Sequence, residues 1–264
     1  MLLSSVIIVL REVLEAALLF SVLIALSKQM GVNFRWLVWS MLLGLLGAFI
    51  YGMNIQLVSE WFEGVGQEVS NALIQLVIYF MLVLYMLMLS YYSYKQKTSK
   101  FFLSLIMTVI VALAMTREGA EIILYFFSVT HSDAHYLAVL VGMTIGASIG
   151  ISIGLLFYYL LNSLKPERSI FIGLILLLLV SAGMISQASL LLIQADWLPA
   201  QLPLWNSSEL LSEKSVTGQL LYALLGYEST PTAIQAGLYL LSLILPLTLI
   251  AGLKFTCTKN HSSL

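Results

Sequence analysis

Long runs of apolar residues, separated by short polar segments, recur along the whole chain. Each run exceeds about 18 residues, the length that a helix needs to cross the hydrocarbon core of a bilayer. We therefore expect seven transmembrane helices, over 2–27, 36–58, 69–94, 101–130, 136–164, 169–195 and 232–253. The predicted fold class is an all-α polytopic membrane protein that forms a single membrane domain, 1–264.

The first six spans fall into two similar units, 1–94 and 101–195. The first span of each unit carries a charged pentapeptide, Arg11 to Glu15 and Arg117 to Glu121. The second span of each carries small residues at every fourth position, which lets neighbouring helices approach closely: Gly44, Ala48 and Gly52 in one, and Gly142, Gly146, Gly150 and Gly154 in the other. Because each unit has three spans, the two copies would enter the membrane from opposite sides, so we expect two inverted three-helix repeats plus a seventh helix.

The remaining segments have simpler roles. The loop 196–231 contains an amphipathic stretch, which predicts a surface helix lying against the bundle; its apolar positions are Val216, Leu220, Leu221, Leu224 and Leu225. The span 232–253 is the seventh helix, and 254–264 is predicted to be a cytoplasmic tail.

The composition supports a membrane location and excludes other classes. Of the 264 residues, 60% are hydrophobic and 9% are charged, whereas a soluble domain carries about 25% charged residues. The formal net charge of −1 and the lack of a basic patch exclude a nucleic-acid binder, and a single cysteine excludes a disulfide scaffold.

Basic residues in the loops predict the orientation. One side of the membrane would carry nine of them: Lys28, Arg35, Lys95, Lys97, Lys100, Lys165, Arg168, Lys254 and Lys259. The opposite side would carry only Lys214. We therefore expect the N-terminus outside and the C-terminus in the cytoplasm.

The charged pentapeptides should lie deep in the hydrocarbon layer. An ionised side chain there costs about 2.5–3.5 kcal/mol, so six of them need partners or a function. Residues three and four apart share a helix face, so each pentapeptide presents two carboxylates and a guanidinium on one side. If the two helices cross, four carboxylates and two arginines converge with a charge of −4 + 2 = −2, which suits a multivalent cation.

Carboxylate oxygens are hard ligands that favour Fe³⁺, Fe²⁺, Mn²⁺, Mg²⁺ or Ca²⁺. The spans hold no histidine or cysteine at depth, since His131 and His135 lie at the outer rim, and this argues against copper and, less strongly, against zinc. The alternative is that the Arg–Glu pairs only hold helices together.

Two segments carry a family resemblance: Leu-Arg-Glu-Val-Leu-Glu-Ala-Ala-Leu in the first span and Thr-Arg-Glu-Gly-Ala-Glu in the fourth. They resemble the paired R-E-G-L-E motifs of the oxidase-coupled high-affinity iron permeases, which include the yeast iron permease and the bacterial EfeU-type transporters. The stretch Gly226-Tyr227-Glu228-Ser229-Thr230-Pro231 is similar to the family's G-Y-x-x-x-P segment. The likeness covers essentially the whole chain, although Val13 stands where the motif usually has glycine.

The resemblance implies an iron importer of the bacterial cytoplasmic membrane. Iron would arrive as Fe³⁺ from an external iron-oxidising partner, and no cofactor beyond the transported iron is implied. The implied metal ligands are Glu12, Glu15, Glu118 and Glu121, with Arg11 and Arg117 tuning their charge. The family's outer E-x-x-E-G motif matches either Glu60 to Gly64 or the segment from Glu68 to Asn71. The acids Glu60, Glu63 and Glu68 are therefore candidate entrance residues, or only a solvated acidic loop.

The competing functions rank below an iron permease, which is a transporter and not an enzyme. They are a transporter of another divalent cation such as Mn²⁺, a scaffold or sensor, and a di-iron oxidase. A di-iron oxidase would usually need Glu-x-x-His pairs, and no intramembrane histidine is present.

Overall fold

The structure is a computed structural model that describes residues 2–95, 99–130, 136–213 and 215–259. His131, His135, Lys97 and Lys214 therefore lie outside the described residues, as do residues 260–264 of the predicted tail. The side chains of Lys95, Lys254 and Lys259 are likewise not described.

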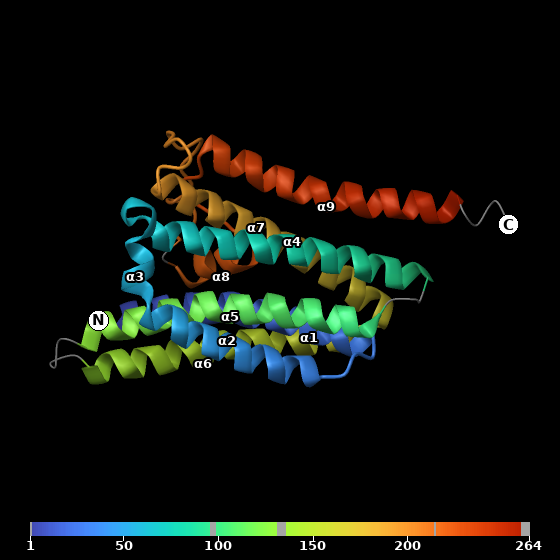
Figure 1. The fold of residues 1–264 in the computed structure, drawn as a ribbon, viewed down its shortest axis with the longest axis horizontal. Helices are drawn as coiled ribbons and strands as arrows, with labels where there is room; N and C mark the ends of the chain where they lie inside the picture. Colours follow the sequence, from blue (N-terminus) through green and yellow to red (C-terminus); the bar gives the residue numbers. More distant parts are fainter. Residues whose placement is uncertain (1, 96–98, 131–135, 214, 260–264) are drawn as a thin grey trace.

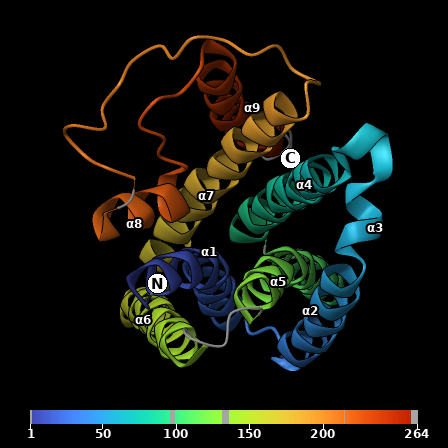
Figure 2. The same cartoon turned by 90° about the vertical axis from the view of Figure 1, so that its left-hand side faces the viewer.

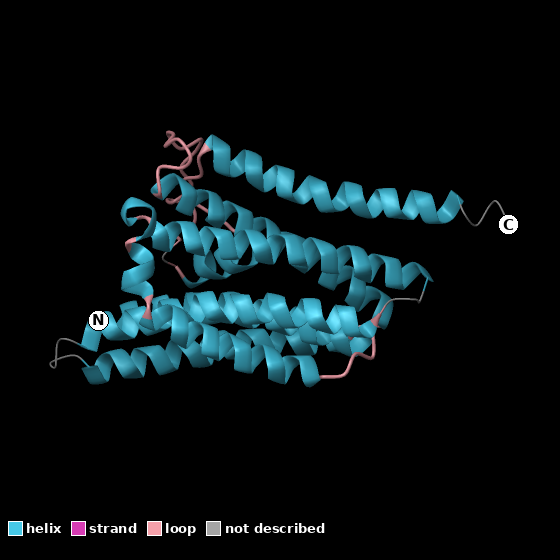
Figure 3. Cartoon of the chain, viewed as in Figure 1, coloured by secondary structure: helices cyan, strands magenta, loops and turns pink. Residues whose placement is uncertain are grey.

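The described part of the chain is helical, without strands (Figures 1 and 3). A single pair of residues, Pro203 and Thr232, forms an isolated antiparallel bridge. The helices are α1 (Leu2–Gln29), α2 (Arg35–Met53), α3 (Ile55–Ser59), the 3₁₀ turn η1 (Trp61–Gly64), α4 (Gly66–Lys95), α5 (Lys100–Thr130), α6 (Tyr136–Ser163), α7 (Pro166–Gln194), α8 (Val216–Leu225) and α9 (Ala233–Lys259).

Six of the described helices are long and apolar enough to cross a membrane: α2, α4, α5, α6, α7 and α9. The helix α1 spans 28 residues but carries ionisable side chains well inside it, Arg11, Glu12 and Glu15. The amphipathic segment of the loop after α7 is helical, as the sequence predicted, and forms α8.

One predicted boundary was wrong. The second span was predicted to run through 58, but α2 ends at Met53. The Asn54 side chain donates to the carbonyl of Ile50, and this kind of local bond competes with helix continuation. At the other end of the chain, the apolar span of α9 ends at Leu253, as predicted, and the helix itself continues to Lys259.

The long helices pack in pairs that join distant parts of the sequence (Figure 2). The most extensive contacts are those of α1 with α6, α2 with α5, and α4 with α7. The helices α1 and α5 also contact each other, and this contact brings the two charged pentapeptides together. The last helix, α9, lies outside the bundle against α7 and α4.

Glycines of α6 permit the close approach of α1. A β-carbon added at Gly146 would lie 3.0 Å from the backbone nitrogen of Leu10 and closer still to the carbonyl oxygen of Val6. Further along, the Ser21 hydroxyl donates to the carbonyl of Gly154 at 2.6 Å, so the two helices also share a buried hydrogen bond. The small-residue ridge therefore holds α1 against α6.

Replacing Gly146 with valine should destabilise the protein by about 1–3 kcal/mol, because the added carbons meet backbone atoms that cannot rotate away. The matched control is Gly237→Val on α9, where an added β-carbon meets nothing within 4 Å. The measurement is the thermal unfolding temperature of the purified protein in detergent. Equal unfolding temperatures for the two variants would contradict the α1–α6 packing.

The two ends of the bundle differ in character. The half that contains the ends of α1 and α4 and the start of α5 is closed by a dense apolar core, in which Leu23, Leu82, Leu89 and Met107 are fully buried. The opposite half contains the buried polar residues of the charged pentapeptides. This polar half contains a cavity lined by side-chain oxygen atoms, including those of Glu68, Asn71 and Glu121.

The long loop after α7 carries α8. The Ser215 hydroxyl caps α8 by accepting from the backbone N–H of Gly218. Gly226 ends α8 in a left-handed conformation, φ 64°, and packs directly on Gly183 of α7. This contact fixes α8 beside α7 and α1.

Glu228 follows α8 and has a shifted pKa. Its half-buried carboxylate accepts from the Gln235 side chain at 2.7 Å. Burial and the nearby charge of Glu213 raise the pKa of Glu228 to about 7, although the bond from Gln235 opposes the shift. Because the folded form binds this proton more tightly than the unfolded form, stability should fall as the pH rises from about 4.5 to about 7.

We therefore expect Glu228→Gln to be more stable than the native chain at pH 8 and equally stable near pH 4. The pKa shift corresponds to at most about 3 kcal/mol, and solvent screening of a half-buried group reduces this to about 1–2 kcal/mol. The measurement is thermal unfolding in detergent at both pH values, with the exposed Glu209→Gln as control. If the difference in unfolding temperature between the native chain and Glu228→Gln is the same at both pH values, titration of Glu228 does not affect stability.

Candidate metal centre

The two charged pentapeptides face each other between α1 and α5. Helix α1 contributes Glu12 and Glu15, which are three residues apart and so share a face. Helix α5 contributes Arg117, Glu118 and Glu121 in the same way. Glu12, Glu15, Arg117 and Glu118 are all buried, and Glu118 is only 4% exposed.

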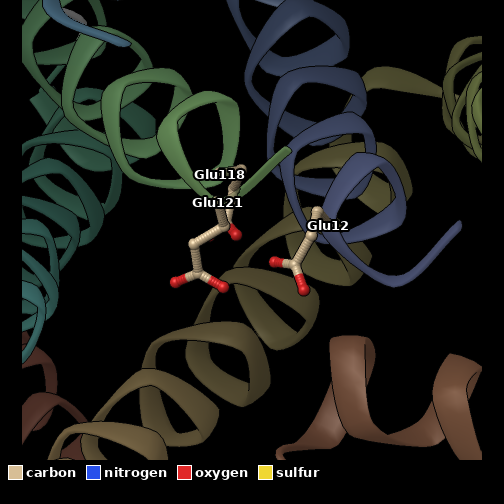
Figure 4. A group of neighbouring side chains, drawn as sticks. All are labelled: Glu12, Glu118 and Glu121. Atoms are coloured by element: carbon tan, nitrogen blue, oxygen red, sulfur yellow. The ribbon is translucent and has the colours of Figure 1, made fainter. Parts of the chain in front are cut away.

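Three of the four carboxylates converge (Figure 4). One oxygen each from Glu12, Glu118 and Glu121 lies within 4.8 Å of the others. The three side chains come from two helices that are far apart in sequence. Oxygens at these separations can bind one cation together after small side-chain movements.

Arg117 is the central counter-ion of this group. Its guanidinium donates to Glu118 Oε1 at 2.5 Å and to Glu15 Oε2 at 3.4 Å, and its other terminal nitrogen lies 3.5 Å from Glu121 Oε1. It is 5% exposed, and so it neutralises charge where water cannot. Its position lowers the cost of gathering carboxylates in this part of the bundle.

Glu15 has a different environment from the other three carboxylates. It pairs with Arg11 at 3.5 Å and with Arg117, and it accepts from the Gln187 side chain at 3.3 Å. Arg11 in turn lies over the ring of Tyr222 on α8, 4.0 Å from its centroid, and its side chain is 36% exposed. Glu15 is thus held by donors on three sides and lies outside the three-carboxylate group.

Buried amides surround the carboxylates, and the sequence reasoning did not identify them as site residues. Asn71 donates to Glu121 Oε1 at 3.3 Å and accepts from the Tyr51 hydroxyl at 3.0 Å. Gln75 on α4 donates to Gln187 on α7, which donates to Glu15. The available signal was a set of uncharged polar residues well inside otherwise apolar spans.

A cavity of about 320 Å³ leads to Glu121 from the polar end of the bundle. Its polar lining comes from α4, α5 and α7: Gln67, Glu68, Asn71, Glu121 and Gln194. Among the candidate entrance acids, Glu68 lines this cavity, whereas Glu60 and Glu63 are exposed residues of the α3–η1 region that do not line it. Glu121 is the most accessible carboxylate of the group, with 29% of its side chain exposed.

The chemistry of the group is that of a hard-cation site. Among the described residues, the three converging ligands are all carboxylates, with no histidine or cysteine. Hard oxygen donors bind iron, manganese, magnesium or calcium in preference to copper.

Comparison with known proteins narrows the choice. The profile of the family described as "Iron permease FTR1 family" matches residues 2–256, nearly the entire chain. The chain belongs to this iron permease family. The family resemblance noted in the sequence is therefore confirmed. Neither the curated proteins nor the solved structures contain a significant match.

Membership of the FTR1 family has direct consequences. It is a family of transporters, which agrees with the prediction that this membrane protein is not an enzyme. The family also indicates iron as the transported substrate. Together with six long apolar helices, it supports a multi-pass membrane protein.

Proposed function

We propose that the chain imports iron through the group formed by Glu12, Glu118 and Glu121. The observation that carries this proposal is the convergence of these buried carboxylates within 4.8 Å, beside a polar cavity. Carboxylates replace the water ligands of a hard cation, and a charge of −2 over the four acids and two arginines favours a trivalent or divalent ion. Glu15 acts with Arg11 to hold Arg117 in place.

The route to the site begins in the cavity that contains Glu68. An arriving ion first meets Glu68 and Gln194, then Glu121, and finally the more deeply buried Glu12 and Glu118. On the other side, the apolar core around Leu23 closes the path. The described conformation therefore offers an ion a polar route to the site from the polar end.

Transport then requires alternating access between two inverted repeats. The packing supports this arrangement, because α1 packs against α6 just as its counterpart α5 packs against α2, while α4 and α7 pack against each other. If the two repeats exchanged conformations, the apolar core would open and the polar cavity would close. In this scheme α1 is a seventh spanning helix, and its charges are neutralised within the bundle.

The orientation is N-terminus outside, in the cytoplasmic membrane of a bacterium. The described ends of α1, α2, α5, α6 and α7 bring exposed basic residues to one end of the bundle, which would face the cytoplasm. These residues are Lys28, Arg35, Lys100, Lys165 and Arg168. Iron would then reach the outer cavity as Fe³⁺ from an external iron-oxidising partner.

The test is radio-iron uptake by cells that lack their own iron importers, with and without the chain. In parallel, purified chain in vesicles receives chelated Fe³⁺ or Fe²⁺ directly, which removes the need for the oxidising partner. We expect uptake that requires the chain and resists excess Mn²⁺ and Zn²⁺. Equal inhibition by Mn²⁺ and by unlabelled iron would indicate a less selective cation transporter, and absence of uptake in both systems would contradict the proposal.

A further inference from the structure

A second cavity lies on the opposite side of the carboxylates. It encloses about 610 Å³ between α1, α2, α5 and α6, and Glu12 and Glu118 form part of its wall. Figure 2 shows α2 and α6 on either side of this region, each paired with a different helix. The rest of the lining is almost entirely apolar, as with Ala16, Leu45 and Leu155.

The cavity extends from the carboxylates toward the basic end of the bundle. Its lining residues on α1 run from Glu12 to Ile24, which corresponds to about 18 Å at 1.5 Å per residue. One leaflet of the hydrocarbon core is about 15 Å thick. The cavity is therefore about as long as one leaflet is thick.

Cationic side chains lie at the far end of the cavity. Tyr158 lines that end, and the Lys28 ammonium lies 5.9 Å from the centroid of its ring. Arg35 begins α2 two residues before Leu37, which also lines the cavity. Lys28 and Arg35 are both exposed, so their charges are available to a membrane-surface anion.

The size of the cavity limits what can fill it. A helix about 10 Å in diameter and 18 Å long occupies about 1,400 Å³, far more than this cavity offers. A methylene group takes roughly the volume of a water molecule, about 30 Å³, so 610 Å³ holds about 20 methylene groups. That number matches one acyl chain of a phospholipid.

We propose that this cavity binds one acyl chain of an anionic phospholipid, whose phosphate lies at Lys28. The chain fills the apolar space between α2 and α6 and keeps water away from Glu12 and Glu118 on that side. Exclusion of water strengthens the attraction between these carboxylates and a bound cation. The lipid also bridges α2 and α6, which the cavity separates.

The experiment is native mass spectrometry of the purified chain after exchange into equal mixtures of phosphatidylglycerol and phosphatidylcholine. We expect one retained phosphatidylglycerol per chain. Ala16→Phe, which fills the cavity, should reduce retention at least fivefold, whereas Ala251→Phe on the exposed face of α9 should not. Lys28→Gln should remove the preference for phosphatidylglycerol, and the exposed Lys165→Gln at the same end should retain it.

Several outcomes would overturn the proposal. Equal lipid retention by Ala16→Phe and Ala251→Phe would show that the lipid lies elsewhere. A doubled protein mass that Ala16→Phe abolishes would assign the cavity to a second copy of the chain. Because lipid mass is measured without iron, a negative result leaves the transport proposal intact, and a failure of transport does not affect this one.

Discussion

Cells that carry Glu118→Gln should accumulate iron no faster than cells without the chain, a loss of at least about 100-fold. Glutamine keeps the size of the side chain but removes one of the three converging charges, and it leaves Arg117 with one fewer strong partner. Loss of a residue that only supports a metal ligand already costs about 10–100-fold, and a ligand costs more. One oxygen of Glu118, Oε2, is buried and has no hydrogen-bond partner among the described residues, so it can bind a cation.

The measurement is radio-iron uptake at matched amounts of protein in the membrane. Glu167→Gln is the matched control, because Glu167 is exposed in the first turn of α7, far from the carboxylate group. Native uptake rates in Glu118→Gln would show that the carboxylate group only holds the helices together, as the scaffold hypothesis requires.

Replacing Arg117 with methionine should prevent stable folding, at a cost of about 3–5 kcal/mol. The change leaves Glu15, Glu118 and Glu121 without their shared counter-ion, and an unpaired buried charge is strongly destabilising. Arg11→Met is the control. It removes one 3.5 Å ion pair to Glu15 from a residue that is more than one-third exposed, so we expect about 1 kcal/mol.

The measurement is the yield and unfolding temperature of monodisperse protein in detergent. A double variant, Arg117→Met with Glu118→Gln, separates charge from shape, because it removes one of the uncompensated carboxylates. We expect it to be more stable than Arg117→Met alone, so that the double variant loses less stability than the sum of the two single changes. A double variant as unstable as the sum of the single changes would mean that the two side chains do not interact.

The helices could be predicted from the sequence because length and apolarity are local properties. The pentapeptides on α1 and α5 were also visible locally, since ionised residues inside an apolar run stand out. The end of α2 was missed because it depends on one side-chain hydrogen bond, from Asn54 to the Ile50 carbonyl. The hydropathy pattern does not record such a bond. Local patterns thus give the elements but not their ends.

The different surroundings of matching charged residues in the two pentapeptides could not be predicted. By spacing alone, Arg11 and Arg117 are equivalent, as are Glu15 and Glu121. The structure buries Arg117 among three carboxylates, while Arg11 lies against Tyr222 of α8, more than 200 residues away along the chain. Such differences arise from long-range packing, which a single sequence does not reveal.

Val13 illustrates the same limit. Its substitution for the usual motif glycine suggested a change in packing, but not which helix would accommodate it. In the structure Val13 packs against Gly150 of α6, whereas Gly119, at the matching position of α5, packs against Ala48 of α2. In the α1–α6 pair the glycine therefore lies on α6, whereas in the α5–α2 pair it lies on α5.

The pairing of α1 with α6 has a consequence for how the protein is made. The ribosome releases α1 first, yet α6 begins at Tyr136, 107 positions after the end of α1 at Gln29. At about 5–20 residues per second, α1 waits roughly 5–20 s for α6, and until α5 supplies Arg117 only the Arg11–Glu15 pair within α1 offsets its charges. During biosynthesis this helix therefore depends on the insertion machinery or on lipid headgroups until the second half of the chain arrives.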